Sequence, residues 1–206
     1  RQSAFESALL IKEAGAKKIY IVHRHKTPKF TQSDWSWVTP LLGRMIEQPD
    51  YYLKLSEQDK DDINKRFWQE GRLKLEPWLK SVEKNKDIDI YEETNITWVD
   101  ITREGQIKAA LGDGAELTAD HLIFATGYKV NIANLPFLNT GNILDRLQTN
   151  NGFPKLRFNF ESSIEGLYFT SLTATSDFGA FFGFTVSCNA SSVIIGNAIA
   201  QAISKS

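Results

Sequence analysis

The chain opens with a helical pattern of apolar positions followed by a strand-like one. Phe5, Ala8 and Leu9 recur at helical spacing, which predicts a helix over residues 4–14. Residues 18–22 (KIYIV) form a short, β-rich apolar run of the kind expected for a buried parallel strand. A helix that leads into such a strand is half of a βαβ unit. We expect the strand that precedes this helix to lie outside the sequence.

Residues 27–86 have a different pattern, which is charged, Trp-rich and helical. Ser33 is a candidate cap of a first helix, which would contain Trp35, Trp37, Val38, Leu41 and Leu42. Ser56 is followed by acidic residues and predicts the start of a second helix that ends near Gly71. We interpret this region as a helical insertion.

From Ile88 onward the apolar period changes towards two, which predicts a β-meander. Two acidic–glycine dipeptides, Glu104-Gly105 and Asp113-Gly114, are typical of hairpin turns. The expected strands cover residues 89–91, 96–99, 107–110 and 116–117.

Three later segments complete the pattern. An apolar strand is expected at residues 121–125, directly before Thr126 and Gly127, and another at residues 166–170. Residues 184–203 are rich in small and apolar residues and predict a terminal helix.

Composition narrows the class of protein. The 206 residues carry 24 basic and 25 acidic side chains, so nothing favours nucleic acid or a membrane surface as a partner. The single cysteine, Cys188, excludes an internal disulfide framework and fits a reducing, cytoplasmic location. The sequence contains no run of about 18 consecutive apolar residues, so we expect no membrane-spanning helix. The three histidines show no metal-ligand spacing with Cys188, so no metal is expected.

The predicted start of the first helix is a candidate phosphate site. Ser3 and Glu6 match a capping box, and the simplest interpretation is a capped helix. The alternative is that Gln2, Ser3 and Ala4 let a pyrophosphate approach the exposed N–H groups of the helix start.

A basic cluster follows the first predicted strand. In a dinucleotide-binding unit, an acidic residue at this position accepts the 2′-hydroxyl of NAD, whereas a basic one accommodates the 2′-phosphate of NADP. Here the sequence is His23-Arg24-His25-Lys26, about 20 residues beyond the helix start. Although a solvated basic loop has the same composition, the spacing favours NADPH, with Arg24 and His25 as candidate contacts.

Aromatic residues gather before the terminal helix. Phe178, Phe181, Phe182 and Phe184 accompany two glycines, Gly179 and Gly183. These residues form either the wall of a flavin pocket or ordinary core packing, and the sequence leaves both open.

Taken together, these segments resemble the NADPH- and FAD-dependent monooxygenases, a group that includes flavin-containing monooxygenases and N-hydroxylating ornithine and lysine monooxygenases. Residues 2–6 (QSAFE) are similar to the end of the family motif Gly-x-Gly-x-Ser-(Gly/Ala)-x-(Glu/Asp), with Arg1 in the place of the second glycine. Residues 120–128 (DHLIFATGY) resemble the segment in which the family's chain leaves the NADPH domain and returns beside FAD.

The resemblance implies an α/β fold with a Rossmann-like NAD(P)-binding domain over residues 1–126, lacking its first strand and carrying the insertion at 27–86. Residues 127–206 would be the carboxy-terminal segment of the FAD-binding domain. It further implies cofactor contacts at Thr126, Gly127 and Tyr128, and near the terminal helix at Asp177, Phe178, Gly183 and Phe184.

The implied function is oxidation of a small-molecule substrate by part of an FAD- and NADPH-dependent monooxygenase, with homo-oligomerisation as a possible further property. Two alternatives stay open at this point. One is an FAD/NADPH reductase that does not transfer oxygen, and the other is a non-catalytic nucleotide-binding or interaction module that docks a partner through the insertion.

Overall fold

The computed structural model describes residues 2–204 and divides into two compact units. The first unit consists of Arg1–Ser33 and Gln69–Gly127, and the second of Asp34–Trp68 and Tyr128–Ser206. The fold mixes helices and strands, in agreement with the predicted α/β class.

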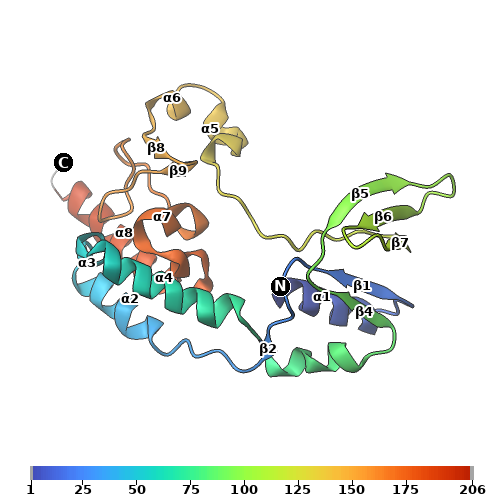
Figure 1. Ribbon diagram of the computed structural model, residues 1–206. Coiled ribbons are helices and arrows are strands. Elements are labelled where there is room, and N and C mark those ends of the chain that lie inside the picture. The colour runs from blue at the N-terminus through green and yellow to red at the C-terminus, as the bar shows by residue number, and fades with distance from the viewer. Residues whose placement is uncertain (1, 205–206) are drawn as a thin grey trace. The chain divides into compact units, whose positions relative to one another are not determined.

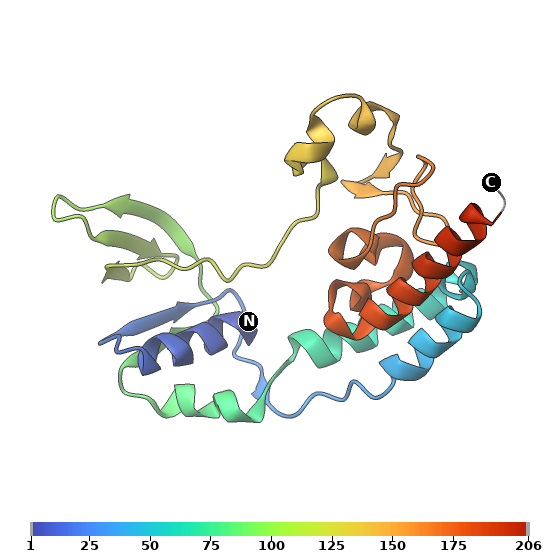
Figure 2. The ribbon, with the colours of Figure 1, turned by 180° about the vertical axis from the view of Figure 1, so that it is seen from behind.

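The first unit is built on a parallel strand pair covered by a helix (Figures 1 and 2). β1 pairs with β4 in register from Ile19↔Ile88 to Val22↔Tyr91, and a shorter parallel pair joins β2 to β3. The elements are α1 (Gln2–Glu13), β1 (Ile19–Val22), β2 (Lys29–Phe30), β3 (Lys74–Leu75), the 3₁₀ helix η1 (Pro77–Lys84) and β4 (Ile88–Tyr91). The first helix and strand therefore form where the sequence predicted them.

The core of the first unit lies between α1, β1 and η1. Phe5 of α1 and Leu79 of η1 are fully buried, and Ile21 of β1 is nearly so. Together with the rest of the cluster they make one apolar interior, whose other buried members are Ala8, Leu75, Val82 and Ile88. Burial of this apolar stripe explains why the short strands hold without a larger sheet.

Three of the four strands predicted for the β-meander form it in the first unit, whereas the first one, at residues 89–91, pairs in parallel with β1 instead. β5 pairs with β6 and β6 with β7, all antiparallel, over Ile96–Ile101, Ile107–Leu111 and Glu116–Ala119. Both hairpins turn at a glycine with positive φ, +82° at Gly105 and +89° at Gly114. The two turn signals in the sequence are confirmed.

The second unit is mostly helical and has an aromatic interior. Its helices and strands are α2 (Val38–Glu47), α3 (Tyr51–Lys54), α4 (Glu57–Arg72), η2 (Ile132–Asn134), α5 (Pro136–Asn139), α6 (Ile143–Arg146), β8 (Thr149–Asn150), β9 (Phe153–Pro154), η3 (Ser171–Ala174), α7 (Thr175–Phe178), η4 (Ala180–Gly183), η5 (Thr185–Ser187) and α8 (Cys188–Ile203). Figure 2 shows α8, in red, running beside α2, in blue.

The expected insertion at 27–86 is divided between the two units. Residues 34–68 pack on the carboxy-terminal residues, because Val38, Leu42 and Met45 share one buried cluster with Phe178 and Phe182. The flanking parts of the range, including η1, pack in the first unit. The sequence pattern predicted helices where α2 and α4 form but did not predict α3, and it could not say which core their apolar faces join.

Ser33 does not cap the first helix, because α2 begins at Val38 and Ser33 Oγ donates to Glu70 O at 2.8 Å. Ser56 caps α4 as predicted, since its Oγ accepts a hydrogen bond from the N–H of Asp59 at 3.1 Å. Trp35 lies against Phe67 with ring centroids 5.4 Å apart, and Arg66 lies 4.9 Å over the ring of Trp37. Trp35 and Trp37 thus both contact side chains of the second unit.

Two predicted strands do not form. Residues 121–125 are extended but pair with no strand among the described residues, and Phe124 is 76% exposed. Residues 166–170 contribute one isolated bridge, Glu161↔Tyr168. A buried strand needs neighbours on its edges, and the described part of the chain supplies none for residues 121–125 and one isolated bridge for residues 166–170.

The terminal helix forms over α8, preceded by η5. By length and composition, Thr185–Ile203 is long and apolar enough to cross a membrane, with a mean hydropathy of 1.3. A single helix of this kind is weak evidence, since core helices of soluble proteins pass the same test. Ala190 and Ile194 of this helix are buried in the cluster that also contains Phe178.

Candidate nucleotide-binding site

The start of α1 and the end of β1 lie together in the first unit. The rings of Phe5, in the first turns of α1, and His23, directly after β1, have centroids 6.0 Å apart. The helix start and the basic loop are therefore neighbours, which a dinucleotide site of the predicted type requires.

The helix start differs in detail from the predicted capping box. Ser3 lies inside α1 and is exposed, while Glu6 accepts a hydrogen bond from Gln2 Nε2 at 2.8 Å. Gln2 Oε1 also accepts from the N–H of Glu76 at 3.3 Å. The capping box is therefore wrong for Ser3 and Glu6, because the helix already includes Gln2, whose longer side chain reaches Glu6.

The other residues of the helix start have distinct environments. Ala4 is half-buried and packs on the core of the first unit. Arg1 lies outside the described residues. The side chain of Gln2 is thus occupied by hydrogen bonds within the unit. Among Gln2, Ser3 and Ala4, the exposed side chain of Ser3 is the one best placed to contact a ligand.

The basic loop after β1 is tied to the end of β4. The N–H of His23 donates to Tyr91 O at 2.9 Å, and the N–H of Thr94 donates to His23 O at 3.2 Å. The N–H of Thr27 donates to Glu92 Oε2 at 2.7 Å. These hydrogen bonds join the carboxyl ends of the parallel strands β1 and β4 at the same edge of the sheet.

In the basic loop, the side chain of His23 is hydrogen-bonded within the loop, whereas the next three side chains are exposed. His23 is engaged, because its Nδ1 donates to His25 O at 2.6 Å. Arg24, His25 and Lys26 are exposed, and Arg24 forms no ion pair or side-chain hydrogen bond with residues 2–204. A guanidinium in this state is able to bind a phosphate bidentately.

Glu92 and Thr27 were not singled out by the sequence. The hydrogen bond from the N–H of Thr27, followed by that from its hydroxyl, lowers the pKa of the Glu92 carboxyl below its usual value. The signal available in the sequence was an acidic pair, Glu92-Glu93, directly after the predicted strand at 89–91.

Thr126, Gly127 and Tyr128 lie in the irregular segment at the border of the two units. All three are exposed, and Tyr128 is 91% exposed. Gly127 has φ of +83°, and a Cβ at this position would meet nothing within 4 Å. The backbone of this segment is therefore accessible to a ligand.

Most of the residues predicted to contact the cofactor near the terminal helix are buried or hydrogen-bonded within the second unit. Phe178 is fully buried and stacks on Phe160 with ring centroids 3.9 Å apart. Asp177 accepts a hydrogen bond from the N–H of Leu156 at 2.8 Å. Of the alternatives for the aromatic group, core packing holds for Phe178, Phe181 and Phe182, which are at most 1% exposed.

Gly183 and Phe184 differ from that buried group. A Cβ on Gly183 would lie 2.9 Å from Leu172 Cδ2, so the absent side chain makes room for packing. Phe184 is 57% exposed and contacts Phe67 with ring centroids 5.5 Å apart. Phe184 is thus the one aromatic ring of the four with surface available to a ligand.

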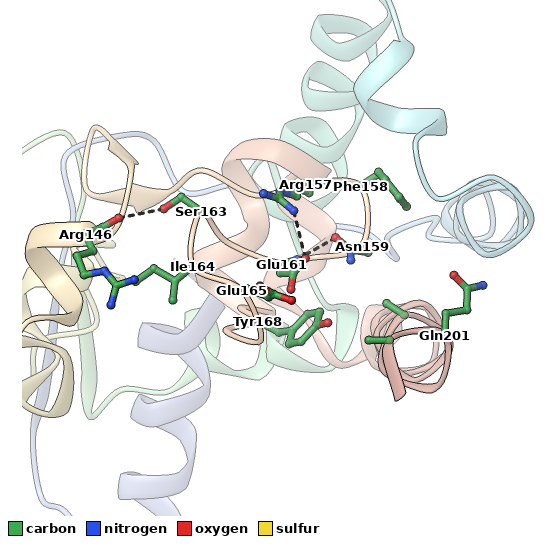
Figure 3. A pocket seen from close by; sticks show the side chains of 12 residues that line it. Arg146, Arg157, Phe158, Asn159, Glu161, Ser163, Ile164, Glu165, Tyr168 and Gln201 are labelled. Atoms are coloured by element: carbon green, nitrogen blue, oxygen red, sulfur yellow. Dashed lines mark hydrogen bonds and ion pairs between the residues drawn. The ribbon is translucent and has the colours of Figure 1, made fainter. Parts of the chain in front are cut away.

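A large open cavity lies in the second unit, away from the residues predicted for cofactors (Figure 3). Its volume is about 780 Å³, and its charged lining residues are Arg146, Arg157, Glu161 and Glu165. Glu161 is bonded within the wall, since it accepts from the N–H of Gly166 at 2.9 Å and lies 3.6 Å from Arg157 Nη1. Burial and then Glu161 raise the pKa of Tyr168 above its usual value. The contacts of Glu161 with Gly166 and Arg157 stabilise the loop over residues 157–168.

Acidic and metal-ligating residues do not converge. Within residues 2–204, no group of three or more His, Cys, Asp or Glu side chains is placed to hold a metal ion.

The sequence matches no protein-family model and no curated protein. Solved structures do match. The ornithine N-hydroxylase of Kutzneria sp. 744, in a structure with reduced FAD, NADP⁺ and L-ornithine, is 14% identical with a TM-score of 0.68, over 97% of this chain and 52% of that one.

Two further matches are similar in extent. The FAD-bound cadaverine monooxygenase of Erwinia amylovora is 18% identical with a TM-score of 0.60, over 94% of this chain and 48% of that one. The L-lysine 6-monooxygenase of Pseudomonas syringae is 18% identical with a TM-score of 0.61, over 99% of this chain and 51% of that one. The chain spans about half the length of the structures it matches, and it has the fold of the corresponding half of these proteins.

Proposed function

We propose that this chain is part of an FAD- and NADPH-dependent monooxygenase that hydroxylates the terminal amine of a small aliphatic substrate. The proposal is carried by the likeness of 94–99% of the chain to an ornithine N-hydroxylase, a cadaverine monooxygenase and a lysine 6-monooxygenase. Each of the three named substrates carries a primary amine at the end of an aliphatic chain, so this is the proposed substrate class.

The first unit is proposed as the NADPH-binding part, a Rossmann-like domain that contains α1 and the parallel strands β1 and β4. This chain's own residues fit NADPH. Arg24 is exposed and unpaired among the described residues, and it lies in a loop held beside the start of α1. Arg24 and Lys26 would hold the 2′-phosphate, and Ser3 with the N–H groups of the helix start would meet the pyrophosphate.

The second unit, Asp34–Trp68 and Tyr128–Ser206, is proposed as part of the FAD-binding domain. The exposed segment Thr126, Gly127 and Tyr128 fits a backbone contact with FAD, and Phe184 fits a side-chain contact. Phe178 and Asp177 do not fit a direct contact, because packing and a backbone hydrogen bond occupy them. They would act by shaping the segment before α8.

When bound, FAD would supply the redox chemistry that couples oxidation of NADPH to reduction of O₂. In the overall reaction one oxygen atom is inserted into an N–H bond of the amine, and the other leaves as water. NADPH and one proton are consumed. The residues described above bind and orient the two nucleotides in this scheme.

The test uses the full protein to which this chain belongs, purified and supplied with FAD. We expect NADPH-dependent consumption of O₂ that ornithine, lysine or cadaverine accelerates, with formation of the corresponding hydroxylamine. NADPH oxidation without any hydroxylamine from a panel of aliphatic amines would favour a reductase. Failure to bind FAD or NADPH would leave the interaction module as the surviving alternative.

A further inference from the structure

The loop over residues 23–27 is closed on itself and on the end of β4. It leaves β1 at His23 and returns at Thr27, next to Glu92. In between, His25 O accepts from the N–H of Glu93 at 3.3 Å, and Glu93 has φ of +57°, in the left-handed region. The loop conformation is therefore determined jointly with the turn that follows β4.

Glu92 makes the side-chain contact at the far end of this loop. Its Oε2 accepts from the N–H of Thr27 at 2.7 Å, which is the length of a charge-assisted hydrogen bond. Glu92 carries a negative charge at neutral pH, since these hydrogen bonds keep its pKa below the ordinary value. The carboxylate thus holds the position where the chain leaves the basic cluster.

His23 closes the loop from the other end. A carbonyl oxygen only accepts, so Nδ1 of His23 carries the hydrogen in its 2.6 Å contact with His25 O. Its Nε2 lies 3.4 Å from Thr27 Oγ1. His23, Thr27 and Glu92 form a set of linked side chains, which we name the loop clamp, and Arg24, His25 and Lys26 lie exposed within the loop it closes.

We infer that Glu92 is a positioning residue for the recognition of the 2′-phosphate of NADPH, acting through Thr27 and the loop clamp. The inference rests on the proposed NADPH site. Three basic side chains on a free loop would lose conformational entropy on binding a phosphate, and a loop fixed in advance avoids part of that loss. The clamp would therefore strengthen binding of the 2′-phosphate and leave the rest of the nucleotide unaffected.

Coulomb repulsion between Glu92 and the phosphate predicts the opposite change in NADPH affinity. A carboxylate near a bound phosphate weakens its binding, so removal of the Glu92 charge would improve NADPH affinity if repulsion dominated. Glu93 provides a matched control, because it is an adjacent exposed carboxylate whose side chain is outside the clamp.

The experiment compares the wild-type full protein, loaded with FAD, with its Glu92→Gln and Glu93→Gln variants. Isothermal titration measures binding of adenosine 2′,5′-bisphosphate, which carries the 2′-phosphate, and of 5′-AMP, which lacks it. We expect Glu92→Gln to weaken bisphosphate binding about fivefold and 5′-AMP binding less than about twofold. Glu93→Gln should leave both nucleotides within about twofold of wild type.

A second measurement tests the clamp without any nucleotide. Amide hydrogen exchange of peptides covering residues 23–27 should be faster in Glu92→Gln than in wild type and unchanged in Glu93→Gln. Unchanged exchange in Glu92→Gln would overturn the clamp, as would tighter bisphosphate binding or equal effects of the two variants. If the wild type bound both nucleotides equally, the proposed NADPH site itself would fail.

Discussion

The two units use their candidate cofactor residues in different ways. In the first unit, Arg24 and His25 are exposed on a loop that backbone hydrogen bonds hold in place. In the second unit, Phe178 is buried in a stack with Phe160, and Asp177 is bonded to the backbone of Leu156. The first unit presents Arg24 and His25 to solvent, whereas the second unit buries Phe178, Phe181 and Phe182 in its interior and leaves Phe184 exposed.

This difference teaches how each kind of motif acts. A charged residue after a strand stays at the surface because burying an unpaired charge is costly. A phenylalanine beside a glycine has no such restriction and is stabilised by burial. Substitutions in the second unit should therefore change stability, and those in the basic loop should change ligand binding.

The largest expected effect is on the aromatic stack. Phe178→Ala should lower the free energy of unfolding by about 3–5 kcal/mol, because it leaves a cavity beside Phe160 and Phe182. Phe184→Ala, at an exposed ring, should cost less than about 1 kcal/mol. Urea unfolding of the full protein measures both, and equal losses would break the contrast between buried and exposed aromatics.

The next effect compares two glycines with positive φ. Gly179 has φ of +97°, and a Cβ there would lie 2.6 Å from Phe181 Cε1. Gly127 has φ of +83° and open space around it. Gly179→Ala should therefore cost about 2–4 kcal/mol, and Gly127→Ala about 1 kcal/mol from backbone strain alone. Thermal unfolding midpoints of the two variants decide whether contact or backbone strain dominates.

A smaller effect is expected on nucleotide preference. Arg24→Ala should weaken NADPH binding about tenfold and leave NADH nearly unchanged, because only NADPH offers a 2′-phosphate to the guanidinium. Fluorescence titration of the full protein with each nucleotide measures the change. Equal weakening for NADPH and NADH would assign Arg24 to a part that both nucleotides share. Unfolding midpoints of this variant should match those of wild type.

The smallest effect concerns an exposed ion pair that joins α1 to the start of β4. Lys12 Nζ lies 2.7 Å from Asp87 Oδ2, and the hydrogen bond from Lys12 lowers the Asp87 pKa below 3.8. A depressed pKa in the folded state contributes stability above the unfolded value of 3.8. That contribution is lost as the pH falls through the lower, folded value.

Asp87→Asn should therefore reduce the urea midpoint slightly at neutral pH. The difference from wild type should disappear as the pH falls below 3.8. A difference that persists in acid would mean that Asp87 stabilises the unit through geometry and not through its charge.

Local signals in the sequence were sufficient for much of the first unit. The helix at the start, the strand at residues 18–22 and the two hairpins of the meander form where predicted, because each is specified by its own period and turn residues. The basic cluster was also placed correctly at the end of β1. The sequence by itself determined these elements and the fold class.

Tertiary contacts decided the rest. Residues 121–125 have a strand composition but lack pairing partners among the described residues, and pairing depends on the chain that surrounds a strand. Helical spacing in residues 34–68 predicted an apolar face, but only the packed structure shows that this face joins the core around Phe178. The link from Thr27 to Glu92 spans 65 residues in the sequence, and only the parallel pairing of β1 and β4 brings these two residues together.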